Sequence, residues 1–200
     1  MIKNIILDFG DVLINLDKPA TAREMLKFGF TGITPELDSL FKEYEKGLVT
    51  SEHFLDLVSL QFPMAQKADL MNAWNAILLD FPEERLTFLE NLAKENEYRL
   101  FLLSNTNDLH IEYVKEQMGM QRFNRFKNAF EMFYLSYEMG MRKPDAEIFE
   151  FVLEQNQLSA HETLFVDDVK DNTDAAASLG IHVWNLQVGQ EDVMQLNRFL

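Results

Sequence analysis

Short apolar segments alternate with helical segments along most of the chain, and this alternation limits the possible folds more than any other feature. Strands that alternate with helices of about ten to fifteen residues are typical of a parallel sheet with helices on both faces. We therefore expect an α/β protein with a Rossmann-like parallel sheet core. The expected strands are Ile2–Leu7, Tyr98–Leu103, Met132–Leu135, Thr163–Val166 and His182–Trp184. The expected core helices are Glu83–Glu95, Asp108–Met118, Asp145–Gln155, Asn172–Leu179 and Glu191–Phe199.

The stretch of residues 19–81 interrupts this alternation, because it has no convincing strand and shows helical spacing of apolar residues throughout. The helical segments expected in it are Ala20–Phe28, Pro35–Tyr44, Ser51–Gln61 and Ala65–Leu79. Four helices are enough for a small bundle. We expect a four-helix cap domain at residues 17–81, inserted into a core domain of residues 1–16 and 82–200.

Composition and charge exclude several classes of partner. The net charge is −15, and a nucleic acid or an anionic membrane would need a basic surface that the sequence lacks. A phosphate substrate would also need a local positive site. There is no cysteine, so disulfides and thiol catalysis are excluded. Asp8 and Asp11 interrupt the first apolar run, which therefore fails as a signal peptide or membrane span. We expect a cytoplasmic protein, either a monomer or a weak homodimer.

Polar side chains stand at the ends of several expected strands. Asp8 ends the first strand, Ser104 and Asn105 follow the second, and Asp167 and Asp168 follow the fourth. Each residue alone has an ordinary explanation as a turn former or helix cap. However, the carboxyl ends of parallel strands meet at one edge of the sheet, where such proteins bind ligands. The set therefore indicates one functional site at this edge.

Together with Lys143, which follows the third strand, these residues suit phosphoryl transfer. Asp8 and Asp168 can hold Mg²⁺, which prefers a few carboxylates together with water and phosphate oxygens. The second oxygen of Asp8 is then available as a nucleophile. Ser104 can donate to the phosphoryl oxygens, and Lys143 can neutralise Asp8 and stabilise the transition state. The sequence thus predicts a Mg²⁺-dependent phosphatase that acts on a small phosphorylated metabolite.

Four segments, in this order, resemble the four motifs of the haloacid dehalogenase superfamily. These segments are Asp8–Leu13, Ser104–Asn105, Lys143–Pro144 and Asp167–Asp168. The resemblance covers the whole chain and implies a helical cap at the position of the insertion. A closer resemblance, to the bacterial phosphatases of α-D-glucose 1-phosphate, involves longer segments. These are Leu103–Asn107, Tyr134–Ser136, Gly140–Pro144 and Phe165–Asp168 with Asp171–Asn172.

The resemblance implies a role for each matched residue. Asp8 would be the nucleophile and a magnesium ligand, and the Gly10 carbonyl and Asp168 would complete the protein's share of the metal shell. The phosphoryl group would be held by Ser104, Asn105 and Lys143. The implied substrate is a sugar phosphate such as glucose 1-phosphate.

One position departs from the superfamily pattern. Most phosphatases of the superfamily carry a second aspartate two residues after the nucleophile, as general acid and base, and here Gly10 stands there. Asp11 is one residue further on, and strand alternation points it to the other face unless the chain turns. The glucose-1-phosphatase type also carries glycine at this position. Activity is therefore expected, but without the usual proton donor for the leaving group.

Two alternatives stay open. In a hydrolytic 2-haloacid dehalogenase, Asp8 would attack carbon without a metal, but such a site would gain nothing from the extra anions of Asp167 and Asp168. A catalytically degenerate binding module is suggested by Gly10 alone. The nucleophile, the lysine and the metal carboxylate are nevertheless all present, which favours an enzyme.

Overall fold

The computed structural model describes all 200 residues and contains one parallel five-stranded sheet. The strands are β1 (Asn4–Leu7), β2 (Arg99–Ser104), β3 (Met132–Leu135), β4 (Thr163–Asp167) and β5 (His182–Asn185). Their spatial order is β3-β2-β1-β4-β5, and every ladder is parallel. The central strand β1 thus lies between β2 and β4. The expected fold class is confirmed.

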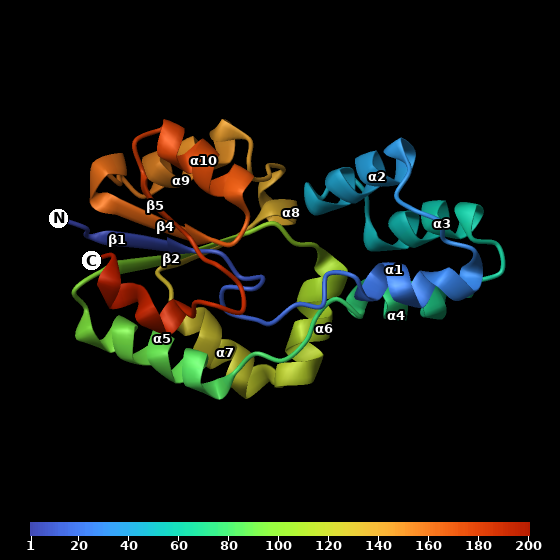
Figure 1. Cartoon of the computed structure of the whole chain (residues 1–200), viewed down its shortest axis with the longest axis horizontal. Helices are drawn as coiled ribbons and strands as arrows, with labels where there is room; N and C mark the ends of the chain where they lie inside the picture. Colours follow the sequence, from blue (N-terminus) through green and yellow to red (C-terminus); the bar gives the residue numbers. More distant parts are fainter.

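Helices cover both faces of the sheet because successive strand residues point to opposite sides. Ile5 and Leu7 of β1 belong to one apolar cluster, and Ile6 between them belongs to a second. Figure 1 shows α5 and α7 below the sheet and α9 and α10 above it. The helices against the first cluster are α5 (Glu83–Glu95), α6 (Asp108–Met118), α7 (Met120–Asn128) and the 3₁₀ helix η3 (Val193–Arg198). Those on the other side are α9 (Ala146–Gln155) and α10 (Lys170–Ser178), with the short α8 (Ser136–Met139) and η2 (Ala160–Glu162) in the connections.

The inserted segment forms a separate group of helices beyond the carboxyl ends of the strands (Figure 1). These helices are α1 (Ala20–Met25) with η1 (Leu26–Phe28), α2 (Pro35–Glu45), α3 (Ser51–Gln61) and α4 (Lys67–Asn75). They pack around their own apolar cluster, which includes Tyr44 and Phe54. We propose to treat residues 17–81 as a cap domain and residues 1–16 and 82–200 as a core domain. An independent apolar cluster in the insertion supports this division.

Two extended segments connect the cap to the core, and they pair with each other. The N–H of Asn15 donates to the carbonyl of Asp80 at 2.9 Å, and the N–H of Asp17 donates to the carbonyl of Ile77 at 2.9 Å. The chain therefore leaves the core and returns to it at one place, across an isolated antiparallel bridge between Leu16 and Leu78.

Several elements differ from the sequence prediction. The short helix α8 was not predicted, and α4 ends at Asn75 and not at Leu79. The helix α7 was not predicted, because it is short and strongly polar. Its Arg125 pairs with Glu83 and Glu90 of α5, so tertiary ion pairs help to hold it in place. The final segment, expected as a helix over Glu191–Phe199, is the shorter 3₁₀ helix η3. Val193 and Leu196 are its buried residues, and their spacing of three matches the 3₁₀ repeat.

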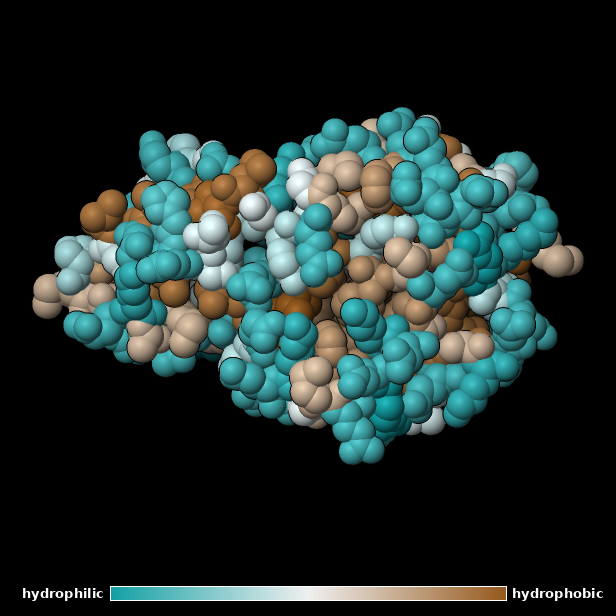
Figure 2. Space-filling model, turned by 180° about the vertical axis from the view of Figure 1, so that it is seen from behind, coloured by the Kyte–Doolittle hydropathy of each residue, from teal (hydrophilic) through white to brown (hydrophobic).

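The molecular surface is mostly hydrophilic, but hydrophobic side chains gather on the cap, which lies on the left in Figure 2. Exposed apolar residues of the cap include Leu26, Ile33, Leu48, Leu60 and Met64. None of the helices combines the length and the hydropathy that a crossing of the bilayer requires.

Candidate active site

A cleft lies between the carboxyl edge of the sheet and the cap. From β1 the chain continues to β2 and β3 on one side of the sheet, and β4 and β5 lie on the other side. The boundary between β1 and β4 is therefore a topological switch point, and open parallel sheets bind ligands at such points. The cleft is lined by Asp8, Lys143 and Asp168 of the core and by Lys42 and Glu45 of α2. Residues of the strand ends thus face the end of a cap helix.

Lys143 is the central cation of this site. Its Nζ donates to Oδ1 of Asp8 at 2.6 Å, to Oδ2 of Asp167 at 2.6 Å and to the carbonyl of Leu103 at 2.8 Å. Three hydrogen bonds use the full donor capacity of an ammonium group. Burial alone would lower the pKa of Lys143, but the charges of Asp167 and Asp8 and hydrogen bonds to both raise it above its ordinary value. The lysine therefore stays charged although it is only 1% exposed.

Asp167 is fully buried, and its contacts hold the site together. Its Oδ1 accepts from the Val169 N–H at 2.8 Å and from Nδ2 of Asn172 at 3.1 Å. Its Oδ2 accepts from Lys143 and, at 3.0 Å, from the same Asn172 amide. Both oxygens are thus engaged within the protein. Asp167 positions the lysine, and Asp168 is left as the member of the pair that lines the cleft.

The carboxylates of the site fit a magnesium ion. Oxygens of Asp8, Asp167 and Asp168 lie within 4.8 Å of one another. Burial raises the pKa of Asp8 to about 7, although the charge of Lys143 opposes this shift. Burial also raises the pKa of Asp168, against its hydrogen bond with Lys18. These raised pKa values mean that the nearby lysines do not fully compensate the negative charges of the two carboxylates. Mg²⁺, a hard divalent cation that prefers oxygen ligands, would compensate them.

Gly10 occupies a position with little room for a side chain. A Cβ added there would lie 2.8 Å from Cδ1 of Leu16 and 3.9 Å from Oδ2 of Asp8. The Gly10 carbonyl accepts from the Val12 N–H at 2.7 Å, which leaves one lone pair for another partner. A general acid at position 10 would therefore require Leu16 to move.

The neighbouring Asp11 is directed to the connection between core and cap. Its backbone φ is +55°, so the chain turns at this residue and strand alternation ends before it. Its Oδ1 accepts from the Leu16 N–H at 3.0 Å, and its Oδ2 pairs with Lys18 at 2.9 Å. Asp11 lines a neighbouring cavity and not the cleft of Asp8. Both its oxygens are engaged within the protein.

The loop after β2 is fixed beside Lys143. The side-chain amide of Asn105 accepts from the Lys143 N–H at 2.8 Å and donates to the Lys143 carbonyl at 2.8 Å. The hydroxyl of Ser136 binds the N–H and the carbonyl of Thr106, at 2.9 and 3.0 Å. The buried hydroxyl of Ser104 makes only a long contact of 3.5 Å with the Asn105 carbonyl. It can therefore rotate to donate to a ligand.

The predicted site residues lie together around one cleft. Asp8, Gly10, Asn105, Lys143 and Asp168 all line it, and Ser104 lies next to Asn105 at the end of β2. Their roles stay a proposal.

Sequence reasoning gave no role to two further residues, Lys18 and Ser136. Lys18 donates to Oδ2 of Asp168 at 2.5 Å from an irregular connection that has no sequence pattern. Ser136 acts through a loop that is distant in sequence, and only its place in a matched segment pointed to it.

The fold is a Rossmann-like parallel sheet with an inserted group of helices beyond the carboxyl ends of its strands. The model of the haloacid dehalogenase-like hydrolase family matches residues 2–180. The chain belongs to this family.

Three relatives illustrate the similarity. The D-ribitol-5-phosphate phosphatase of Bacteroides thetaiotaomicron is 28% identical and aligns with 96% of this chain and 95% of its own length. The sesquiterpene phosphatase astK of Aspergillus oryzae is 26% identical over 99% of this chain and 96% of its own. The solved structure of the family enzyme bt-2542 of B. thetaiotaomicron is 38% identical, with a TM-score of 0.88 and 98% coverage of both chains. That enzyme has also been solved in complex with magnesium and inorganic phosphate.

These similarities confirm the superfamily that the motifs predicted. They also confirm the class of enzyme: the chain is a phosphatase of this family, a phosphoric monoester hydrolase, and its cofactor is Mg²⁺.

Proposed function

We propose that this phosphatase hydrolyses a small sugar or polyol phosphate, such as glucose 1-phosphate, by transfer of the phosphoryl group to Asp8. The observation that carries the proposal is the position of Asp8, which lines the cleft while its Oδ1 is held by the buried Lys143 at 2.6 Å. One carboxylate oxygen is thus fixed by the protein, and the other is available to a ligand.

The reaction needs two displacements at phosphorus. An oxygen of Asp8 attacks, the ester bond breaks, and its electron pair leaves with the alcohol oxygen, which takes a proton from water. A water molecule then attacks the aspartyl-phosphate, so that phosphate is released and the carboxylate of Asp8 is restored. Lys143 keeps Asp8 oriented and supplies positive charge beside the transferring group.

The ligands of the metal are assigned from the same geometry. Asp8, the carbonyl of Gly10 and Asp168 would hold Mg²⁺, which supplies charge neutralisation at the phosphoryl oxygens when it is bound. The hydroxyl of Ser104 and the loop at Asn105 would hold the phosphoryl group, and Lys143, whose three donors are already used, would bind it through its positive charge. Since the Asn105 amide is already bonded to the Lys143 backbone, its part is mainly to place the loop and the lysine.

The choice of substrate class has support from the resemblance and from one relative. The motifs resemble phosphatases of glucose 1-phosphate, and a relative that aligns along almost the whole chain is named for D-ribitol 5-phosphate. The sesquiterpene phosphatase shows that relatives also act on other esters. Cap residues would select among them. A cytoplasmic enzyme, monomeric or weakly dimeric and without nucleic acid or membrane partners, completes the proposal.

The decisive test is phosphate release from p-nitrophenyl phosphate and a panel of sugar and polyol phosphates. Asp8→Asn should abolish turnover, because an amide is neither a nucleophile nor an anionic ligand. The matched control is Asp174→Asn, a change at an exposed residue of α10 that should leave turnover intact. EDTA should stop the wild-type enzyme, and added Mg²⁺ should restore it. Normal turnover by Asp8→Asn would refute the mechanism.

The same panel separates the alternatives. A dehalogenase would release halide from 2-haloacids without a metal and would not cleave phosphates. A degenerate binding module would bind phosphate esters but turn over none of them.

A further inference from the structure

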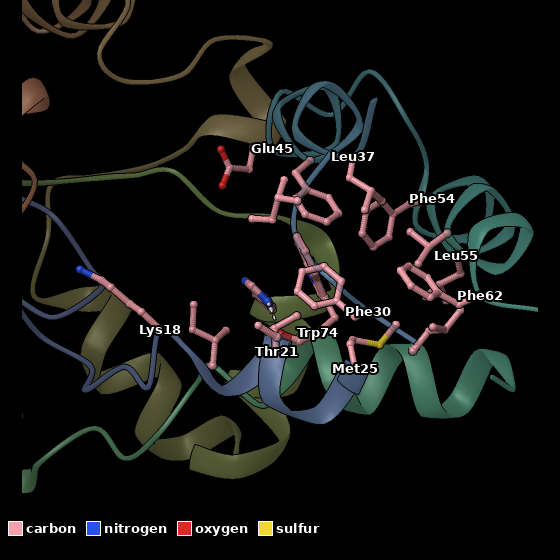
Figure 3. A pocket seen from close by; sticks show the side chains of 17 residues that line it. Lys18, Thr21, Met25, Phe30, Leu37, Glu45, Phe54, Leu55, Phe62 and Trp74 are labelled. Carbon is pink, nitrogen blue, oxygen red and sulfur yellow. Dashed lines mark hydrogen bonds between the residues drawn. The ribbon is translucent and has the colours of Figure 1, made fainter. Parts of the chain in front are cut away.

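A second cavity lies inside the cap. Its volume is about 240 Å³, and 13 of its 17 lining residues are hydrophobic. All four cap helices contribute residues to its lining, including Met25 of α1, Leu37 of α2, Phe54 of α3 and Trp74 of α4 (Figure 3). Preformed hollows with a mostly apolar lining are typical binding sites for small molecules.

This cavity adjoins the catalytic cleft, because Lys18 and Glu45 line both. Figure 3 shows these two residues at the end toward the core and Phe62 at the opposite end. Nζ of Lys18 lies 2.5 Å from Oδ2 of Asp168, which the proposed function makes a metal ligand. A group attached to a phosphate at Asp8 would therefore enter the cavity from this end.

Only four of the 17 lining residues are polar, so the lining offers few partners for sugar hydroxyls. The hydroxyl of Thr21 and Nε2 of His110 both donate to the Trp74 carbonyl, at 3.4 and 3.1 Å. Glu45 is paired with Arg142 at 2.9 Å, and the fourth polar residue is the lysine already paired with the acidic edge. A hydroxylated group deep in this cavity would replace few of the hydrogen bonds to water that it loses. An apolar group would lose none.

We propose that the cavity binds the apolar part of a phosphomonoester substrate, an aliphatic or aromatic group of about six or more carbons. Apolar cavities of roughly 150 Å³ already hold a benzene ring, so the volume here is sufficient. The proposal rests on the proposed function, because it takes the phosphate of this substrate to lie at Asp8. It adds a class of esters to the small sugar and polyol phosphates.

The test is a series of n-alkyl phosphates from ethyl to octyl, with Mg²⁺. The alcohols of the series differ little in acidity, so chain length is the main variable. Each buried methylene should raise kcat/KM about three- to fourfold, or roughly 100-fold between ethyl and hexyl phosphate. The matching alkyl phosphonates, which are not hydrolysed, should show the same trend in Kd by calorimetry.

Two variants address the cavity itself. Ala22→Leu on α1 fills part of it and should remove most of the chain-length dependence, whereas Ala68→Leu at an exposed site of α4 should not. Ile33→Ser changes a lining residue that is 62% exposed, so the fold should tolerate it, and it should weaken binding of hexylphosphonate but not of methylphosphonate.

The outcomes separate this inference from the proposed function. If p-nitrophenyl phosphate is hydrolysed with Mg²⁺ but neither alkyl series depends on chain length, the cavity assignment is wrong and the proposed function stands. If the phosphonates bind with the expected trend but no phosphate ester is hydrolysed, the cavity assignment stands and the proposed function is wrong. A trend that Ala22→Leu leaves unchanged would also overturn the cavity assignment.

Discussion

At the residue scale, Lys143 connects two aspartates with different roles, Asp8 in the cleft and the buried Asp167. Its ammonium is shared between Asp8 at the end of β1 and Asp167 at the end of β4. The sequence predicted the lysine and the acidic pair from their positions at strand ends. It could not show that Asp167 is saturated by Lys143 and Asn172, because those contacts depend on the register of β4 and α10.

Removal of this charge should destabilise the protein as well as inactivate it. Lys143→Met leaves Asp8 and Asp167 buried without their counter-ion, and breaking a buried pair in this way costs about 3–5 kcal/mol. Urea unfolding in EDTA measures the loss. Lys170→Met, at an exposed ion pair on α10, is the control and should unfold like the wild type. An equally stable Lys143→Met protein would show that the buried network adds nothing to stability.

The absence of a side chain at Gly10 should appear in the choice of leaving group. General acid catalysis commonly contributes roughly 10²–10⁴-fold, and it matters most for basic alkoxides. Glucose 1-phosphate should therefore be cleaved better than glucose 6-phosphate, because an anomeric hydroxyl is more acidic than an ordinary alcohol. Single-turnover rates across phosphates of graded leaving-group pKa should show a steep dependence.

The geometry around Gly10 sharpens that test. Because an added Cβ meets Leu16, the informative variant is Gly10→Asp combined with Leu16→Ala, and Leu16→Ala alone is its control. The double variant should flatten the dependence on leaving-group pKa. Asp11→Asn should leave the steep dependence unchanged, since Asp11 is bound to Leu16 and Lys18. A flat dependence in the wild type would mean that another group already donates the proton.

At the scale of elements, periodicity predicted most helices and strands because their apolar residues face a single core. The expected segment Glu83–Glu95 coincides with α5, and Met132–Leu135 coincides with β3. Periodicity missed α7, whose stability depends in part on ion pairs with α5. It also gave no information on how the cap helices meet the core, since those contacts join segments far apart in the chain.

At the end of α2, two ion pairs and one close backbone contact hold the cap against the core near Lys143. Glu45 pairs with Arg142 at 2.9 Å, and Lys46 pairs with Asp145 at 3.0 Å. Gly47 follows with φ +67° and packs so closely on α8 that an added Cβ would lie 2.0 Å from the Tyr137 carbonyl oxygen. A glycine is required here both by backbone conformation and by space.

Gly47→Ala should therefore undock α2 from α8. We expect kcat/KM for a sugar phosphate to fall by about 10-fold or more, because the cap would no longer close over the cleft in one position. Hydrogen exchange in α8 should increase as well. Gly29→Ala is the matched control, since Gly29 has φ +88° but nothing within 4 Å of an added Cβ. If both variants behave alike, backbone strain and not docking explains the effect.

At the scale of the whole molecule, the protein is strongly acidic, but its cleft has as many cationic as acidic side chains to meet an anionic substrate. The net charge is −15, but four cationic and four acidic residues line the cleft. They are Lys18, Lys42, Arg142 and Lys143, with Asp8, Glu45, Asp168 and Asp171. The sequence predicted the need for a local positive site. It could not predict that two of the four cations come from residues 17–81, because these two lysines reach the cleft through the packing of that segment against the core.

A half-buried histidine connects the core to the inserted helices and links the stability of the whole molecule to pH. His110 of α6 donates from Nε2 to the Trp74 carbonyl of α4 at 3.1 Å, and its Nδ1 accepts from Asn107 at 3.2 Å. The Asn107 oxygen is oriented for this arrangement, because it accepts from the Trp74 indole at 3.2 Å. The ring is thus held in its neutral form, with both nitrogens satisfied.

Burial lowers the pKa of His110 from 6.5 to about 4, and the hydrogen bond to Trp74 only partly opposes the shift. The unfolded chain therefore binds a proton between these pH values that the folded protein does not, so stability falls as the pH drops from about 6.5 toward 4. The loss due to this residue should be about 2 kcal/mol at pH 5 relative to pH 7.5. His110→Gln does not titrate and should lack this part of the pH dependence, although it is less stable at both pH values. His53→Gln, at an exposed position of α3, should retain it. Urea unfolding of the three proteins at both pH values gives the difference directly, and equal pH dependence in wild type and His110→Gln would show that this histidine does not link stability to pH.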